Sequence, residues 1–417
     1  MMSLDAVKIN LFSIPLGLAS QSMLWLSLGN GSLRIGTSLW DSFAKASAII
    51  QNIFWYASMF ALGVLVLLYG AKIVFARKQV QREWRHPILM NFFMMPFIAT
   101  MMLGMSQPQY IIDALHPGTR VTQTFFIPIA ALVFGLELKI YGIWLFELRN
   151  SMELVNPAYQ VSIVGNFILA SFGSNVRAAD GTHDLPCQQT GLFFFSVGAM
   201  YQLIVLVSLY QKTPVHIDHA VEAMQAKLQP GLRPIMEREA SVRSLPVHDG
   251  RLVVDDNPKM ELNGVAEEDS LDETDSQSKH DFILGSQLHP IFFLMVAPPS
   301  AASLAWCQLF GSFDTVSRML LFVALYFVIF FIRHHEFFFH GISFSVAWWA
   351  YSFPSAAIAA AMANYAGELQ SRFLAWVALL MSLASILAVC GVSLLTVRAF
   401  TLALPQTKGP RQSAAAV

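Results

Sequence analysis

The sequence predicts an all-α integral membrane protein of ten transmembrane helices, built as five tandem helical hairpins. Of its 417 residues, 55% are hydrophobic and only 13% are charged, whereas soluble domains carry about 25% charged residues. The mean hydropathy is +0.53. Apolar segments of spanning length account for this excess, and a helix breaker recurs in every second segment. We therefore expect the odd-numbered helices to lie inside, around a central pore, and the even-numbered helices to lie outside.

The ten apolar segments cover residues 9–29, 50–76, 88–105, 123–146, 159–175, 190–210, 290–310, 315–333, 343–365 and 371–401. An even number of spans places both termini on one side of the membrane. That side carries most of the Lys and Arg residues of the connecting segments, including the cluster within residues 77–85. Because basic loops stay in the cytoplasm, both termini are predicted to be cytoplasmic.

The chain divides into four parts by composition. Residues 1–210 hold helices 1–6, residues 289–404 hold helices 7–10, and residues 405–417 form a short cytoplasmic tail. The loop 211–288 contains fifteen of the 27 Asp and Glu residues and few aromatic residues, which is typical of a disordered segment. We expect this loop to be cytoplasmic. Ser241 and Ser244 closely follow arginines there, so both are possible phosphorylation sites and protein kinases are possible partners.

Helix breakers occupy the interior of each odd segment. They are Pro15, Pro96, Gly165, Pro298 and Pro354 in the first, third, fifth, seventh and ninth segments. A proline inside a helix removes one backbone hydrogen bond and costs roughly 3 kcal/mol. Within a bilayer such breaks occur where the helix packs against protein or lines a wet cavity. The breakers therefore predict kinks in five inner helices, although a helix kinked only for packing remains the alternative for each one.

The residues near these breaks give the expected lining of the pore. The polar members are Ser20, Asn91, Ser162, Asn166, Ser300 and Ser303, and the aromatic members are Phe92, Phe93, Phe167 and Phe353. None of these side chains carries a fixed charge. Helix breaks expose backbone N–H groups, which favours anions over cations. Aromatic rings across a narrow bore exclude water and close it.

Ionisable residues inside the spans are few. Glu137 and Lys139 lie in the fourth segment, where pairing between helices is favoured over a role in transport, and Lys72 lies near the end of the second, where it can snorkel. The sequence contains no catalytic motif and no spacing typical of a metal site. We therefore predict neither an enzyme nor a cofactor. The net charge of −1 gives no reason to expect a nucleic-acid partner.

Six motifs spread over the chain carry a family resemblance. They are GLASQSMLW (17–25), HPILMNFF (86–93), LELKIYGIW (136–144), NPAYQVSIVGNF (156–167), APPSAASLAW (297–306) and FSVAWWAYSFP (344–354). With these motifs the chain resembles the plant slow-type anion channels, within the tellurite-resistance and dicarboxylate transporter superfamily. The resemblance extends over all ten predicted helices.

This resemblance implies a homotrimer in the plasma membrane that passes chloride and nitrate. It also implies that Phe353, which directly precedes Pro354, occludes the pore. A dicarboxylate (malate) or sulfite carrier of the same superfamily is the alternative function, and a membrane receptor or scaffold is a third.

Overall fold

The computed structural model describes residues 7–29, 38–111, 120–147, 156–177, 182–211, 286–335 and 344–403. These residues are helical, and the extended pairing among them is one isolated bridge between Arg177 and His183. Residues up to Leu206 and from Ser286 onward form one compact unit. The acidic loop, with Ser241 and Ser244, lies almost wholly outside the described residues, as does the tail 405–417. The predicted all-α class is confirmed for the described residues.

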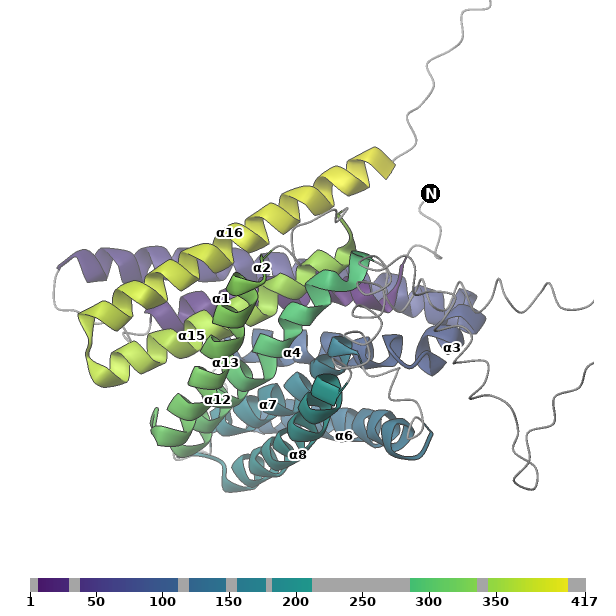
Figure 1. The fold of residues 1–417 in the computed structure, drawn as a ribbon, viewed down its shortest axis with the longest axis horizontal. Coiled ribbons are helices and arrows are strands. Elements are labelled where there is room, and N and C mark those ends of the chain that lie inside the picture. Colours follow the sequence, from purple (N-terminus) through teal and green to yellow (C-terminus); the bar gives the residue numbers. More distant parts are fainter. Residues whose placement is uncertain are drawn as a thin grey trace, which may run out of the picture. The chain divides into compact units, whose positions relative to one another are not determined.

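Five helices of the compact unit share one construction, a 3-10 helix that continues directly into an α-helix. The pairs are η2 (Ile9–Phe12) with α1 (Ser13–Gly29), η3 (Leu89–Met94) with α4 (Met95–Met105), η6 (Pro157–Tyr159) with α7 (Gln160–Asn175), η7 (Ser286–Val296) with α12 (Ala297–Phe310), and η8 (Val346–Tyr351) with α15 (Ser352–Leu369). Figure 1 labels the α-helical parts. These are the segments for which the sequence predicts breaks.

The breaks take the form of a change in helix type at the first turn of each α-helix. Pro15 and Pro354 are third residues of α1 and α15, and Pro96 and Pro298 are second residues of α4 and α12. The first N–H groups of an α-helix have no partner within it, so proline is tolerated there. The prolines therefore begin α-helices rather than kinking their interiors. Gly165 lies inside uninterrupted α7, whose change of helix type falls earlier, where η6 ends.

The five α-helices form a closed ring of contacts. α1 contacts α4, α4 contacts α7, α7 contacts α12, α12 contacts α15, and α15 contacts α1 again. Small side chains permit this close packing, since α15 alone contributes seven buried alanines, Ala356, Ala357, Ala359, Ala360, Ala361, Ala363 and Ala366. We call α1, α4, α7, α12 and α15 the five-helix ring.

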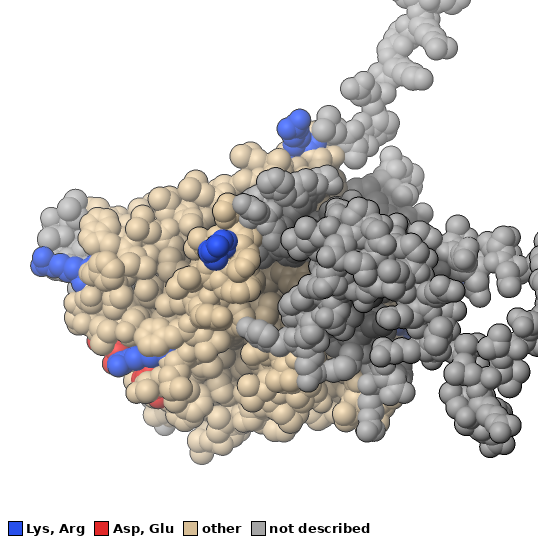
Figure 2. All heavy atoms as spheres, viewed as in Figure 1, with Lys and Arg blue, Asp and Glu red and all other residues tan. Residues whose placement is uncertain are grey.

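All of the remaining helices except the short, basic α3 present large apolar side chains on their outer faces. The remaining helices are α2 (Ser38–Phe75), α3 (Arg77–Arg85), α6 (Arg120–Gly142) with its π-helical continuation η4 (Ile143–Glu147), α8 (Leu185–Gln211), α13 (Thr315–Arg333) and α16 (Arg372–Ala403). Phe60, Leu67, Phe373 and Leu394 are each more than 70% exposed. On the face shown in Figure 2 the described residues carry few charged side chains, and one of these is a lone basic residue near the middle of the face. Such a surface is suited to lipid.

Seven helices among the described residues are long and apolar enough to cross a membrane. The count becomes eight if the bent pair Arg77–Arg85 and Leu89–Met105 forms one span. The multi-pass character predicted from the sequence is therefore confirmed, while the predicted number of ten exceeds this count. One reason is the change of helix type, because α4 and α7 have only 11 and 16 residues, against about 20 for a regular transmembrane helix.

A close approach between α1 and α15 gives a first testable prediction. A Cβ atom at Gly17 would meet the side chain of Ser352 and lie 2.7 Å from Cε3 of Trp349. Since overpacking of a tight core costs roughly 1 to 3 kcal/mol, Gly17→Ala is expected to lower the thermal stability of the detergent-purified protein. Gly63→Ala in α2 is the matched control, because its Cβ would meet no atom within 4 Å. Equal stability of the two variants would contradict the α1–α15 packing.

Candidate functional site

A cavity of about 190 Å³ lies where the C-terminal parts of all five ring helices meet. Its lining residues are Met23, Leu26 and Ser27 of α1, Met105 of α4, Asn175 of α7, Leu304, Cys307 and Gln308 of α12, and Asn364 of α15. Because every ring helix contributes from its C-terminal part, the five helices run in the same direction around a common axis. The cavity is therefore one end of a candidate path along that axis.

The polar groups of this cavity are neutral. Asn175 Nδ2 donates to Gln308 Oε1 at 3.2 Å and to the Ser171 carbonyl at 2.8 Å, and Asn364 Nδ2 donates to the Ala360 carbonyl at 3.0 Å. No Asp, Glu, Lys, Arg or His is among the lining residues. Amide groups of this kind can bind an ion of either sign without fixing a charge at the entrance. These residues were not predicted from the sequence. The pattern that could have identified them is an amide side chain near the end of three predicted inner segments, at Asn175, Gln308 and Asn364.

The lining residues predicted from the sequence lie deeper in the protein and are buried. Ser20, Asn91, Phe92, Ser162, Asn166, Phe167, Ser300, Ser303 and Phe353 are all less than 9% exposed. Phe93 is half-buried. Little of the surface of these side chains is therefore accessible to water.

The structure brings two of the predicted polar residues together. Ser162 Oγ of α7 lies 3.2 Å from Asn91 Oδ1 of η3 and 2.9 Å from the Tyr159 carbonyl, so its single proton is within reach of both acceptors. Ser20 and Ser300 instead donate to carbonyls of their own helical segments, those of Gly17 at 2.6 Å and Val296 at 2.7 Å. Their hydroxyl protons are therefore already engaged, and only the oxygen lone pairs remain for other contacts.

Three of the predicted lining residues are directed toward outer helices instead. Ser303 Oγ donates to the carbonyl of Ser317 in α13 at 2.8 Å. Phe93 pairs edge-on with a tryptophan of α3 at 4.9 Å between ring centroids. Phe167 pairs in the same way with Phe195 of α8 at 5.2 Å. These side chains therefore stabilise the packing of the ring against its surroundings.

Phe353 occupies the second position of α15, directly after the change of helix type. Its side chain is 4% exposed, and among the described residues no aromatic ring pairs with it. Two aromatic residues that precede it differ in this respect, since Tyr351 packs against Phe293 at 5.2 Å and Trp349 Nε1 donates to Thr396 at 3.0 Å. Among the described residues, Phe353 thus combines deep burial with the absence of an aromatic partner.

Lys72 does not snorkel as predicted, because it is 1% exposed and forms a buried ion pair. Its Nζ atom lies 2.6 Å from Glu83 Oε1 and donates to the Val7 carbonyl, also at 2.6 Å. The second oxygen of Glu83 accepts from Tyr69 Oη at 2.8 Å and from the Ile9 backbone N–H at 3.3 Å. These contacts hold Val7 and Ile9, which precede α1, against α2 and α3.

A family model described as "Voltage-dependent anion channel" matches residues 6–227 and 279–397, which is more than half of the chain. The chain belongs to the SLAC1 family. The family match omits residues 228–278, all of which lie in the predicted acidic loop. That loop is therefore an insertion relative to the SLAC1 family pattern.

Several curated relatives of this SLAC1-family chain are plant proteins. The S-type anion channel SLAH2 of Arabidopsis thaliana is 30% identical over 387 residues, which cover 93% of this chain and 58% of the relative. The guard cell S-type anion channel SLAC1 of the same plant is 30% identical over 386 residues, covering 92% and 54%. This chain therefore spans about half the length of these relatives. A tellurite resistance protein TehA homolog of Haemophilus influenzae is 24% identical over 197 residues, covering 46% and 51%.

Proposed function

We propose that this chain is an S-type anion channel that passes chloride or nitrate passively along the axis of the five-helix ring. The observation that carries the proposal is the closed ring whose members all line one cavity free of fixed charge. The names of the relatives, S-type anion channels, support the same class of substrate. In this proposal ten spans form five hairpins, with the ring helices inside and the others outside.

The direction of the ring helices supports selectivity for anions. Since all five α-helices end at the cavity, their N-terminal ends gather at the opposite end of the ring. The N-terminal end of a helix carries a partial positive charge from the aligned peptide dipoles. The first N–H groups of α1, α4, α7 and α15 already bond carbonyls of the preceding 3-10 helix, so the helix dipole is what supports this selectivity. Five such ends around one axis favour an anion entering from that side. Neutral side chains of Ser and Asn near these ends can complete its coordination.

Three further features of the proposal follow from the family resemblance. Phe353 is the gate, positioned at the change of helix type in α15. The protein assembles as a homotrimer in the plasma membrane, with both termini and the loop 211–288 in the cytoplasm. Kinases acting on Ser241 or Ser244 in that loop are the proposed regulators.

A current recording tests this function against its alternatives. For a channel, the reversal potential is expected to follow the chloride or nitrate gradient and to be independent of any coupled ion. A malate or sulfite carrier, the function suggested by the wider superfamily, would instead give substrate-dependent currents or uptake without a chloride or nitrate conductance. A receptor or scaffold would give no current at all, although the protein reaches the membrane.

A further inference from the structure

A buried carboxyl group lies behind the ring and has no cation to neutralise it. Glu137, in α6, is 2% exposed, and its Oε1 atom has no hydrogen-bond partner. No Lys, Arg or His among the described residues pairs with it, since the ion pair found there joins Lys72 and Glu83. Lys139 is engaged elsewhere, with its Nζ atom 3.2 Å from the ring centroid of Trp84. An unpaired carboxylate in such a place carries a large desolvation penalty.

A chain of polar contacts leads from Glu137 to the ring. The Asn166 side chain lies beside the Glu137 carboxyl, and its amide donates to Tyr141 Oη at 2.7 Å. The Tyr141 hydroxyl lies beside Ser162, whose Oγ is 3.2 Å from Asn91 Oδ1 and 2.9 Å from the Tyr159 carbonyl. Residues four apart lie on the same face of a helix, as do Glu137 and Tyr141 in α6 and Ser162 and Asn166 in α7. Glu137 and Tyr141 therefore face Asn166 and Ser162.

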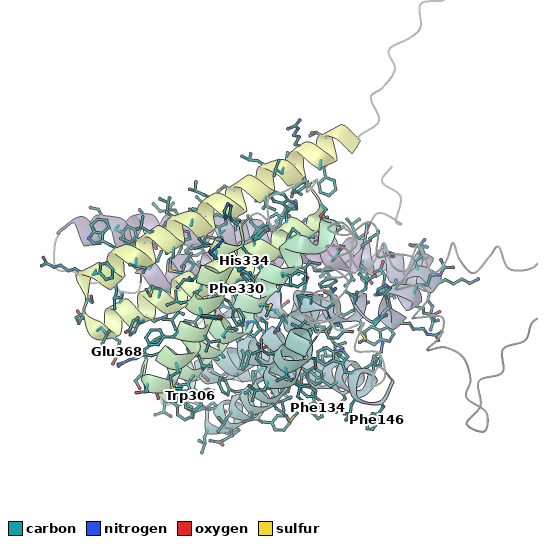
Figure 3. The ribbon with its side chains drawn as sticks, viewed as in Figure 1. Phe134, Phe146, Trp306, Phe330, His334 and Glu368 are labelled. Carbon is teal, nitrogen blue, oxygen red and sulfur yellow. The ribbon has the colours of Figure 1, made fainter. Side chains whose placement is uncertain are left out.

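The site is enclosed on its third side by α8. Tyr201 of α8 stacks on Tyr141, with ring centroids 3.6 Å apart. The backbone of Gly198, also in α8, approaches Asn166 so closely that a Cβ there would lie 2.8 Å from the Asn166 Cβ. Figure 3 labels Phe134, from the same helix as Glu137, which pairs with Phe194 of α8 at 6.2 Å. The titratable groups that face Glu137 are thus Tyr141 from α6 and Tyr201 from α8, while α7 presents an amide.

The hydrogen-bond inventory of this site lacks one proton. Asn166 Oδ1 is buried and unpartnered, like Glu137 Oε1, and both atoms are acceptors. A carboxylate cannot donate, whereas a neutral carboxylic acid has one O–H donor. An amide and a carboxylic acid can form a pair of hydrogen bonds, N–H to oxygen in one direction and O–H to oxygen in the other. A proton on Glu137 therefore supplies the missing donor and removes the unpaired charge.

We propose that Glu137 is a proton-binding site, and that the protein conducts anions while this proton is bound. Loss of the proton places a negative charge behind Asn166 and Ser162, at one wall of the ring, and opposes an anion on the axis. The second half of this statement rests on the proposed channel function, whereas the first half does not. Glu137 does not itself touch the anion in this proposal, so it acts as a positioning and charge-setting residue.

The two halves are tested by two measurements on the same variants. Infrared difference spectra of the purified protein report the carbonyl stretch of a neutral, buried carboxylic acid. We expect this band in the wild type, its loss as the pH is raised, and its absence from Glu137→Gln. Glu368→Gln, which alters an exposed carboxyl at the end of α15, is the matched control and is expected to keep the band.

Anion currents over the same pH range test the functional half. Wild-type current is expected to fall by about tenfold as Glu137 loses its proton, the effect of one unit charge across about one helix diameter at an effective dielectric constant of about 20. Glu137→Gln, a neutral isostere, is expected to conduct at every pH, and Glu137→Asp is expected to restore the pH dependence.

Each outcome tests either the proton site at Glu137 or its coupling to anion conduction. Absence of the band from the wild type at every pH would overturn the proton site. A band together with an unchanged pH profile in Glu137→Gln would overturn the coupling to conduction. If no variant conducts but the band behaves as expected, the proton site is supported and the channel function is what fails. Should Glu137→Gln not fold, Glu137→Asp still tests the site by a shift of the band and of the pH profile.

Discussion

Phe353→Ala is expected to give an anion current in the absence of any activating kinase. Phe353 is buried at the start of α15, and no aromatic ring of the described residues pairs with it. A Phe side chain covers about 150 to 250 Å², so its removal leaves space that water can fill within a pore. Since each roughly 1.4 kcal/mol taken from a barrier is a factor of ten in rate, we expect a rise in basal current of about tenfold or more. The basal current of Phe353→Leu should lie between those of the wild type and Phe353→Ala.

Phe327→Ala is the matched control for this variant. Phe327 is also 4% exposed, but it lies in α13 and belongs to an apolar cluster with Leu321 and Phe331. Truncating a core aromatic costs roughly 3 to 5 kcal/mol, so this variant is expected to lose surface expression and to gain no current. If Phe353→Ala behaves like Phe327→Ala, then Phe353 is an ordinary core residue. If it reaches the membrane and remains silent, the gate lies elsewhere, with Phe92 as the next residue to test.

Lys72→Met is expected to cause the largest loss of stability among the substitutions considered. It leaves the Glu83 carboxylate buried with only the Tyr69 hydroxyl and one backbone N–H as partners. Removing one member of a buried ion pair typically costs roughly 3 to 5 kcal/mol. The expected result is a marked decrease in thermal stability, together with detachment of residues 7–9 from α2, which limited proteolysis near the N-terminus can detect.

Two further variants separate the loss of pairing from the loss of a lysine. Lys78→Met removes an exposed lysine of α3 and is expected to be nearly neutral, as are most surface substitutions. The double variant Lys72→Met with Glu83→Met is expected to recover most of the lost stability, because it leaves no buried charge. A double variant as unstable as Lys72→Met alone would contradict the ion-pair explanation.

The broad architecture could be predicted from the sequence because it follows from composition and from the spacing of prolines. Apolar length gives the spans, and prolines at equivalent places in alternate segments mark the composite helices. Composition and proline spacing could not show whether each proline kinks a helix or begins one. Proline is compatible both with a kink in a helix interior and with the first turn of a helix. The choice depends on whether the preceding residues are α-helical or 3-10, which depends on packing in the ring.

The side chains that line the candidate path were harder to predict. A helix buried on all sides has no amphipathic pattern that tells its inner from its outer face, and α7 is buried from Gln160 to Ser174. Phe167 and Ser303 therefore looked equivalent to Asn91 in the sequence, yet they contact outer helices. The partners of Lys72 were equally hidden, since Glu83 lies in a short basic helix whose position relative to α2 only the fold reveals.

The central claim, that the five-helix ring surrounds the anion path, is tested most directly at Cys307. This thiol lines the cavity, whereas Cys187 is buried and Cys390 is exposed on α16. A negatively charged methanethiosulfonate reagent, applied to a conducting form of the protein from the cavity side, is expected to reduce the current. Chloride or nitrate should slow the reaction, and Cys307→Ser should abolish the effect. Complete modification of Cys307, measured by mass spectrometry, with no change in current would place the path outside the ring and contradict this account.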